Sequence, residues 1–189
     1  MDCFLSQASL THPIEANLNR PQTNLDRNAL LSLLQSYGKQ KSLQKARKLH
    51  TEIILHKKEM LHGDIYISNA LISMYVKCGA LDDAKEAFDE IRMRNVVSWN
   101  TLISGYVRGG LYDEALNLFQ KMRELCFHPN AITLACILKA CANTGSLHMG
   151  EEMHKEVLKL RLLGKNIVVG TALVDMYAKC GVLGKAQEV

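Results

Sequence analysis

Met74-Tyr75-Val76-Lys77-Cys78-Gly79 returns later in the chain as Met176-Tyr177-Ala178-Lys179-Cys180-Gly181, with the two tyrosines 102 residues apart (177 − 75). A related segment, Gly105-Tyr106-Val107-Arg108-Gly109-Gly110, lies between them. The sequence around His50 likewise recurs around His154, 104 residues later (154 − 50). Fixed spacings of this kind mark a repeat architecture, in which neighbouring units stack and share one continuous core.

Aligning these segments divides the chain into an N-terminal tail, residues 1–26, and five units. Each unit is expected to hold two helices, because two apolar stripes of helical period are separated by a glycine break. We therefore predict an all-α fold, an α-α superhelix, whose last unit is truncated. The unit boundaries are 27–64, 65–95, 96–130, 131–166 and 167–189.

The unit at 96–130 shows this plan most clearly. Val96-Val97 is expected to be extended, with Ser98 as the N-cap of the first helix. Gly109-Gly110 should end that helix, and Asp113-Glu114 should open the next one, where carboxylates suit the helix dipole. The two apolar faces are formed by Leu102, Ile103 and Tyr106, then by Ala115, Leu118, Phe119 and Met122.

Composition sets only broad limits on function. With 48% apolar and 22% charged residues, the chain has enough apolar side chains to fold. The net charge of +4 is compatible with a polyanionic partner, but it does not discriminate. The six cysteines include no C-x-x-C pair and are expected to be reduced thiols. No apolar run approaches the ~20 residues of a membrane-spanning helix, so no membrane partner is expected.

Residues 1–26 show no helical period and are expected to form a flexible tail. They hold one basic residue, Arg20, beside Asp2, Glu15 and Asp26. Because organelle transit peptides are rich in arginine and poor in acidic residues, this segment gives little support for one.

The stretch Val96-Val97-Ser98-Trp99-Asn100-Thr101-Leu102-Ile103-Ser104-Gly105-Tyr106 resembles the first helix of a pentatricopeptide repeat, and residues 113–122 resemble the second. The resemblance covers nearly everything after residue 26, and it implies a right-handed solenoid. Units of 31, 35 and 36 residues resemble the S, P and L repeats of the plant PLS subfamily. The S-type units are 65–95 and 167–189, the P-type unit is 96–130, and the L-type units are 131–166 and 27–64, which is divergent with an insertion around residues 56–62.

The resemblance implies binding of single-stranded RNA, one base per repeat. In this family the fifth and last residues of a repeat read the base edge, and the second residue packs against the base plane. The implied base readers are Asn69 with Asn95, Asn100 with Asn130, and Thr171 without a partner in the chain. The implied packing residues are Tyr66, Val97 and Val168.

An asparagine amide offers both a donor and an acceptor, so an Asn pair suits a pyrimidine edge. In this family, threonine at the fifth place implies a purine. The L-type units carry Leu31 with Asp64 and Ala135 with Asn166 at these places, and an apolar side chain makes no hydrogen bond to a base edge. The expected target is 5′-N-Y-Y-N-R-3′, with Y a pyrimidine and R a purine. The alternative role for Asn69 and Asn100 is a helix cap or a turn.

Lys77, Arg108 and Lys179 occupy equivalent places near the ends of the first helices. They are candidates for contacts with RNA phosphates. The alternative is that they complement the helix dipoles on a solvated face.

No catalytic site, metal site, cofactor or small-molecule substrate is expected. A zinc deaminase needs H-x-E followed by P-C-x-x-C. His154-Lys155-Glu156 matches the first motif, but no P-C-x-x-C occurs. Cys136 and Cys141 are five residues apart, ~140° around a helix, which is a poor arrangement for sharing a metal.

The resemblance implies that the chain is the recognition part of an RNA editing or processing factor in a plant mitochondrion or chloroplast, with other editing factors as partners. The alternative function is a protein-protein interaction scaffold of tetratricopeptide-like type. Because Val189 falls inside the second helix of the last unit, we also expect a fragment of a longer protein that lacks C-terminal extension domains.

Overall fold

The computed structural model describes the backbone of residues 27–189 and the side chains of residues 27–55 and 63–189. The predicted tail (1–26) and the side chains of the predicted insertion (56–62) lie outside the described residues. The described part contains ten helices and no strand, which confirms the all-α prediction. The helices are α2 (Arg27–Gln40), α3 (Leu43–Gly63), α4 (Ile65–Cys78), α5 (Leu81–Glu90), α6 (Val96–Arg108), α7 (Tyr112–Glu124), α8 (Ala131–Thr144), α9 (Leu147–Lys159), α10 (Ile167–Lys179) and α11 (Leu183–Glu188).

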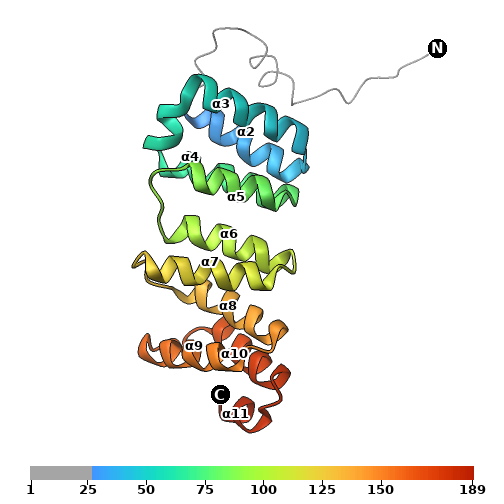
Figure 1. Ribbon diagram of the computed structural model, residues 1–189, viewed down its shortest axis with the longest axis vertical. Helices are drawn as coiled ribbons and strands as arrows, with labels where there is room; N and C mark the ends of the chain where they lie inside the picture. Colours follow the sequence, from blue (N-terminus) through green and yellow to red (C-terminus); the bar gives the residue numbers. More distant parts are fainter. Residues whose placement is uncertain (1–26) are drawn as a thin grey trace, which may run out of the picture.

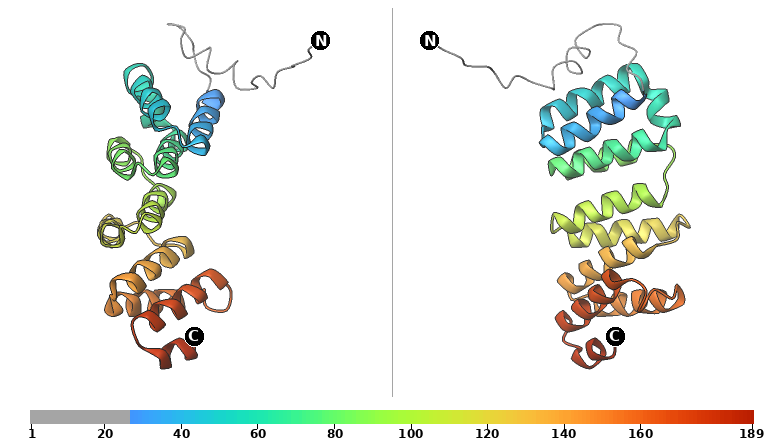
Figure 2. Two further views of the ribbon diagram at one scale, coloured as in Figure 1. Left: turned by 90° about the vertical axis from the view of Figure 1, so that its right-hand side faces the viewer. Right: turned by 180° about the vertical axis from the view of Figure 1, so that it is seen from behind.

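The helices stack in order along one long axis, from α2 at one end to α11 at the other (Figure 1). The left view of Figure 2 shows two layers: α2, α4, α6, α8 and α10 form one, while α3, α5, α7 and α9 form the other. Each even-numbered helix packs directly on the next even-numbered helix. Such a stack is a solenoid, and one apolar core runs through it from α2 to α10. Among the described residues, we find no helix that combines the length and the apolarity needed to cross a membrane.

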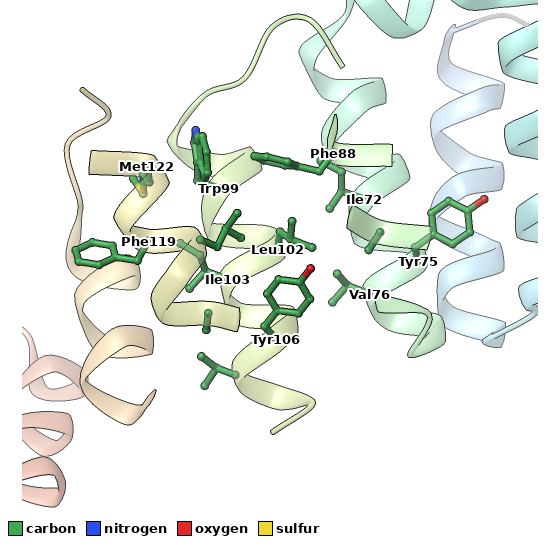
Figure 3. Packing of buried hydrophobic residues seen from close by; sticks show 14 of the residues in the cluster. Ile72, Tyr75, Val76, Phe88, Trp99, Leu102, Ile103, Tyr106, Phe119 and Met122 are labelled. Carbon is green, nitrogen blue, oxygen red and sulfur yellow. The ribbon is translucent and has the colours of Figure 1, made fainter. Parts of the chain in front are cut away.

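The predicted apolar stripes are buried, as their helical period requires. In Figure 3, Leu102 and Ile103 of α6 lie between Phe119 of α7 and Ile72 of α4. Each first helix therefore buries one side against its own partner and another side against the preceding unit. This arrangement explains why a single unit cannot complete its core alone.

Glycine is required at two kinds of position in this stack. Gly79 ends α4 with φ 76°, a left-handed conformation that L side chains rarely adopt. Gly105 lies inside α6, where an added Cβ would stand 2.8 Å from Cγ2 of Val76. The missing side chain at Gly105 therefore lets α6 approach α4 closely.

The predicted start of α6 is wrong by three residues. Val96-Val97 is helical, and the N-cap is Asn95, whose side-chain oxygen accepts a hydrogen bond from the backbone N–H of Ser98. The Ser98 hydroxyl in turn accepts from the backbone N–H of Asn95. Serine is a common N-cap, but Ser98 occupies the third helical position. The pair of bonds between Asn95 and Ser98 is a capping box, in which the side chain of each residue accepts a hydrogen bond from the backbone of the other.

Two histidines connect consecutive units through tyrosines of the recurring motif. His50 Nε2 lies 3.1 Å from a carboxylate oxygen of Glu90, so it donates, and Nδ1 accepts from the Tyr75 hydroxyl at 3.0 Å. His154 Nδ1 lies 2.9 Å from the Tyr177 hydroxyl. His154, the first residue of the H-x-E match, therefore has a packing role between α9 and α10.

This arrangement predicts that the protein loses stability on mild acidification. Burial lowers the pKa of His50 below its ordinary value, and it does so although Glu90, Asp83 and Glu86 act in the opposite direction. Since the unfolded chain takes up the proton near pH 6.5, the stabilisation is complete above that pH and falls as the pH drops toward the folded pKa. Each pKa unit of depression corresponds to about 1.4 kcal/mol.

Urea unfolding at pH 7.5 and pH 5.5 measures this effect, and we expect a lower midpoint at pH 5.5. The difference should shrink in His50→Gln, and it should persist in His148→Gln, whose side chain is exposed on α9. A midpoint that rises on acidification would contradict the assignment.

Candidate nucleic-acid interface

The structure brings Asn69 and Asn95 together across the boundary between two units. Asn69 lies in the second turn of α4, and Asn95 caps α6. Asn69 Nδ2 donates to Asn95 Oδ1 at 3.5 Å, and Asn69 Oδ1 accepts from the Ser98 hydroxyl at 2.6 Å. The two predicted base readers of this unit are thus held in one hydrogen-bonded group with a serine of the next unit.

The same group recurs one unit later with closer contacts. Asn100 Nδ2 donates to Oδ1 of Asn130, the N-cap of α8, at 3.0 Å. The Thr133 hydroxyl donates to Asn100 Oδ1 at 2.6 Å, and the Thr133 backbone N–H donates to Asn130 Oδ1 at 3.2 Å. Two consecutive units therefore present equivalent polar groups at the same end of the same helix layer.

Geometry separates the roles of the four asparagines. Asn95 and Asn130 have the cap role, which sequence reasoning had offered as an alternative for Asn69 and Asn100. Capping engages their side-chain oxygens, while within the described residues their Nδ2 atoms have no hydrogen-bond partner. They can therefore offer donors to a ligand. Asn69 and Asn100 each keep one further N–H and one further lone pair, because an amide has four hydrogen-bonding sites.

The second residues of α4, α6, α8 and α10 form an exposed row of large hydrophobic side chains along the same layer. Val97 and Val168 are 54% and 62% exposed, and Tyr66 is 66% exposed. Ile132, 59% exposed, holds the same place in α8 and was missed by sequence reasoning, which left the L-type units out. The Tyr66 ring also lies under the Arg27 guanidinium, 5.3 Å from its carbon to the ring centroid.

The remaining predicted base-edge positions lack this polar group. Asp64 caps α4 and forms an ion pair with Arg27, which holds the pKa of that carboxyl below its usual value. Asn166 caps α10 by accepting from the Val169 N–H at 3.2 Å. The exposed Thr171 donates its hydroxyl to the carbonyl of Ile167 in its own helix. The fifth-position residues of the same two units are Leu31, which is paired with Asp64, and Ala135, which is paired with Asn166. Both are partly buried apolar residues.

The three candidate cations differ in their surroundings. Lys77 and Arg108 line an open groove of about 480 Å³ together with Lys39 and Lys41. Lys179 instead forms an ion pair with Asp175 at 3.0 Å. Each of the three lies in the last turn of its helix, where a cation also complements the helix dipole.

Metal chemistry gains no support from the described part of the chain. It contains no group of three or more His, Cys, Asp or Glu side chains placed to hold a metal ion. Cys136 and Cys141 both lie on α8, and burial raises the pKa of the Cys141 thiol to about 12.

Comparison with known proteins gives matches of three kinds. Residues 94–143 match a model described as the PPR repeat family, and residues 66–96 match a PPR repeat model. The Arabidopsis thaliana pentatricopeptide repeat-containing protein At2g13600 is 38% identical over 163 residues, which are 86% of this chain and 23% of that protein. A second Arabidopsis relative, At1g59720, named chloroplastic/mitochondrial, is 35% identical over 91% of this chain and 27% of its own length.

Solved structures share the fold. The structure of the pentatricopeptide repeat protein PPR10 in complex with an 18-nt psaJ RNA element aligns with a TM-score of 0.66 and 20% identity, covering 86% of this chain and 24% of that one. PPR10 from maize aligns with a TM-score of 0.62 and 24% identity, covering 87% and 24%. The chain thus spans about a quarter of the length of these proteins. The matched repeats and the relatives support an assignment of this chain to the pentatricopeptide repeat proteins, and the solved structures share its solenoid fold.

Proposed function

We propose that this chain binds single-stranded RNA along the layer formed by α2, α4, α6, α8 and α10. The observation that carries the proposal is the repeated Asn pair: Asn69 with Asn95, and Asn100 with Asn130. A surface for an arbitrary peptide has no reason to repeat this group at one place in consecutive units. A polymer with a regular base spacing does have such a reason.

Each pair suits a pyrimidine. The cap asparagines offer N–H donors, and the pyrimidine O2 atom is an acceptor in both cytosine and uracil. The fifth-position amide adds one donor and one acceptor, which complement the rest of the Watson–Crick edge. The exposed row of Tyr66, Val97 and Val168 would cover the base planes, and Thr171 would contact a purine. The proposed target is 5′-N-Y-Y-N-R-3′, one base per unit.

A role in an organelle is also part of the proposal. The PPR10 structure was solved with RNA bound, and several relatives are named mitochondrial or chloroplastic. We infer a role as the recognition part of an RNA editing or processing factor in one of these organelles, together with other editing factors. The alternating unit lengths support repeats of the PLS type, with boundaries at 27–64, 65–95, 96–130, 131–166 and 167–189.

Phosphate contacts would come from Lys77 and Arg108, which share the basic groove with Lys39 and Lys41. Lys179 takes part only if its ion pair with Asp175 opens, at a cost typical of exposed pairs, about 0–1 kcal/mol. Base contacts worth ~1–3 kcal/mol each, reduced by the cost of association, give an expected affinity in the micromolar range or weaker.

Fluorescence anisotropy with a labelled 12-nucleotide RNA containing C-C at the two Asn-read positions tests the proposal. We expect micromolar binding of the single strand and at least tenfold weaker binding of the same strand in a duplex, whose base edges are paired. If the protein is folded and monomeric but binds neither form, RNA binding is wrong for this chain, and the protein-interaction scaffold becomes the better account.

A further inference from the structure

A buried hydroxyl from the following unit contacts each fifth-position asparagine. The Ser98 and Thr133 side chains are fully buried, and each hydroxyl lies 2.6 Å from the amide oxygen of Asn69 or Asn100. Neither hydroxyl belongs to the predicted pairs. The inference drawn from them rests on the proposed function, because it concerns how the same site distinguishes bases.

The hydrogen bonds determine which end of each amide faces which neighbour. The backbone N–H of Thr133 can only donate, so the atom of Asn130 that receives it is the oxygen. The atom of Asn100 that faces this oxygen at 3.0 Å must then be the nitrogen. The other amide atom of Asn100 is its oxygen, which accepts the hydroxyl proton of Thr133. The same reasoning applies to Asn69, Asn95 and Ser98.

The hydroxyl occurs in this chain only where a fifth-position asparagine precedes it. The equivalent third residue of α4 is Ile67, and the preceding unit has Leu31 at its fifth place. The equivalent residue of α10 is Val169, and the preceding unit has Ala135. Helix capping alone does not account for this pairing, because Asp64 and Asn166 cap α4 and α10 without a hydroxyl at the third position.

We propose that Ser98 and Thr133 are positioning residues for base selection. Each hydroxyl fixes the fifth-position amide of the preceding unit, so that its remaining N–H and lone pair meet the base in one order. Without the hydroxyl only the N–H contact to the cap oxygen, 3.5 Å for Asn69 and 3.0 Å for Asn100, still holds the amide, so the order of donor and acceptor is less firmly fixed. Base selectivity then depends on a residue of the next unit as well as on the two base readers.

The test compares two double variants. The first combines Ser98→Ala and Thr133→Val and removes both hydroxyls. The second combines Ser98→Thr and Thr133→Ser and keeps both hydroxyls. The readout is the ratio of affinities for C-C and U-U RNAs, because cytosine and uracil present donor and acceptor in opposite orders, and a general loss of binding would not change this ratio. We expect this ratio to fall at least threefold in the first variant and to recover in the second. An unchanged ratio in Ser98→Ala plus Thr133→Val, with folding verified by circular dichroism, would overturn the proposal.

A measurement without RNA separates this proposal from the proposed function. The side-chain ¹⁵N–¹H signals of Asn69 and Asn100 should shift when the hydroxyls are removed, while those of the exposed Asn117 on α7 should not. If the signals shift in a protein that binds no RNA, the proposed function fails but the amide positioning stands. If they do not shift, the positioning itself is wrong.

A gain of selectivity provides the strictest test. Ala135→Asn places an amide before the cap Asn166, and adding Val169→Thr supplies the missing hydroxyl. We expect a preference for C over U at the fourth RNA base in the double variant and little preference in Ala135→Asn alone. Equal selectivity in the two variants would contradict a role for the hydroxyl.

Discussion

Trp99→Ala is expected to destabilise the protein by ~3–5 kcal/mol, as large aromatic truncations in a core do. Trp99 is 2% exposed and packs edge-on against Phe88 of α5, with ring centroids 4.8 Å apart. Its other side faces Phe127, which follows α7, at 5.7 Å. Figure 3 shows the indole of α6 directed toward Phe88 of the preceding unit. Truncation therefore leaves a cavity between two units.

In a stacked array a weakened junction also reduces cooperativity, because each unit is stabilised mainly by its neighbours. Urea unfolding of Trp99→Ala should show a broader transition or two transitions. Hydrogen exchange should then be faster on both sides of the junction, in α5 and α6, than in α9. A single sharp transition with an unchanged midpoint would contradict this packing.

Trp99→Phe is the matched control. Within the described residues, the indole Nε1–H is buried without a hydrogen-bond partner, a deficit that typically costs about 1–3 kcal/mol. Phenylalanine removes that donor while keeping an aromatic ring between the two phenylalanines. We therefore expect Trp99→Phe to lower the free energy of unfolding by less than about 1.5 kcal/mol, much less than Trp99→Ala does.

Replacing Asn69 and Asn100 by serine together is expected to remove the preference for C-C over A-A RNA. The shorter side chain cannot keep an amide N–H and a lone pair at the base edge, and it also removes the closer of the two acceptors of the Ser98 and Thr133 hydroxyls. Hydrogen bonds of ~0.5–1.5 kcal/mol each predict a loss of about tenfold in selectivity. Asn117→Ser on α7, in the other layer, should leave the preference for C-C over A-A RNA unchanged.

Competition binding with both RNAs measures this effect. The double variant should keep its salt-dependent affinity, since the cations of the groove are untouched. A variant that still prefers C-C by tenfold would show that these asparagines do not read the bases.

Periodicity made the fold predictable. Stripes such as Leu102, Ile103 and Tyr106 follow the 3.6-residue period so closely that their burial follows from their spacing. The helix start at Val96 was not predictable in the same way, because β-branched residues favour extended structure and serine favours caps. The bond from the Ser98 backbone N–H to the Asn95 side-chain oxygen shows which residue caps the helix.

Contacts that join distant parts of the chain could not be predicted from one unit at a time. The Thr133 hydroxyl meets Asn100 across 33 positions, and the Arg27 guanidinium covers Tyr66 from the preceding unit. Aligning the third residues of the units, which are polar only at Ser98 and Thr133, would have supplied the missing signal. The ion pair of Lys179 with Asp175 was equally hidden, although the two are only four residues apart, because many exposed pairs at that spacing do not form.

The central claim is that the two Asn pairs read bases. It is tested most directly by titrating the unaltered protein with two RNAs that differ only at the two Asn-read positions, C-C against A-A, over a series of salt concentrations. We predict about tenfold tighter binding of C-C, with a ratio that stays constant while both affinities fall as salt increases. Equal affinities that vanish together at high salt would contradict the claim and would reduce the interaction to contacts with phosphates alone.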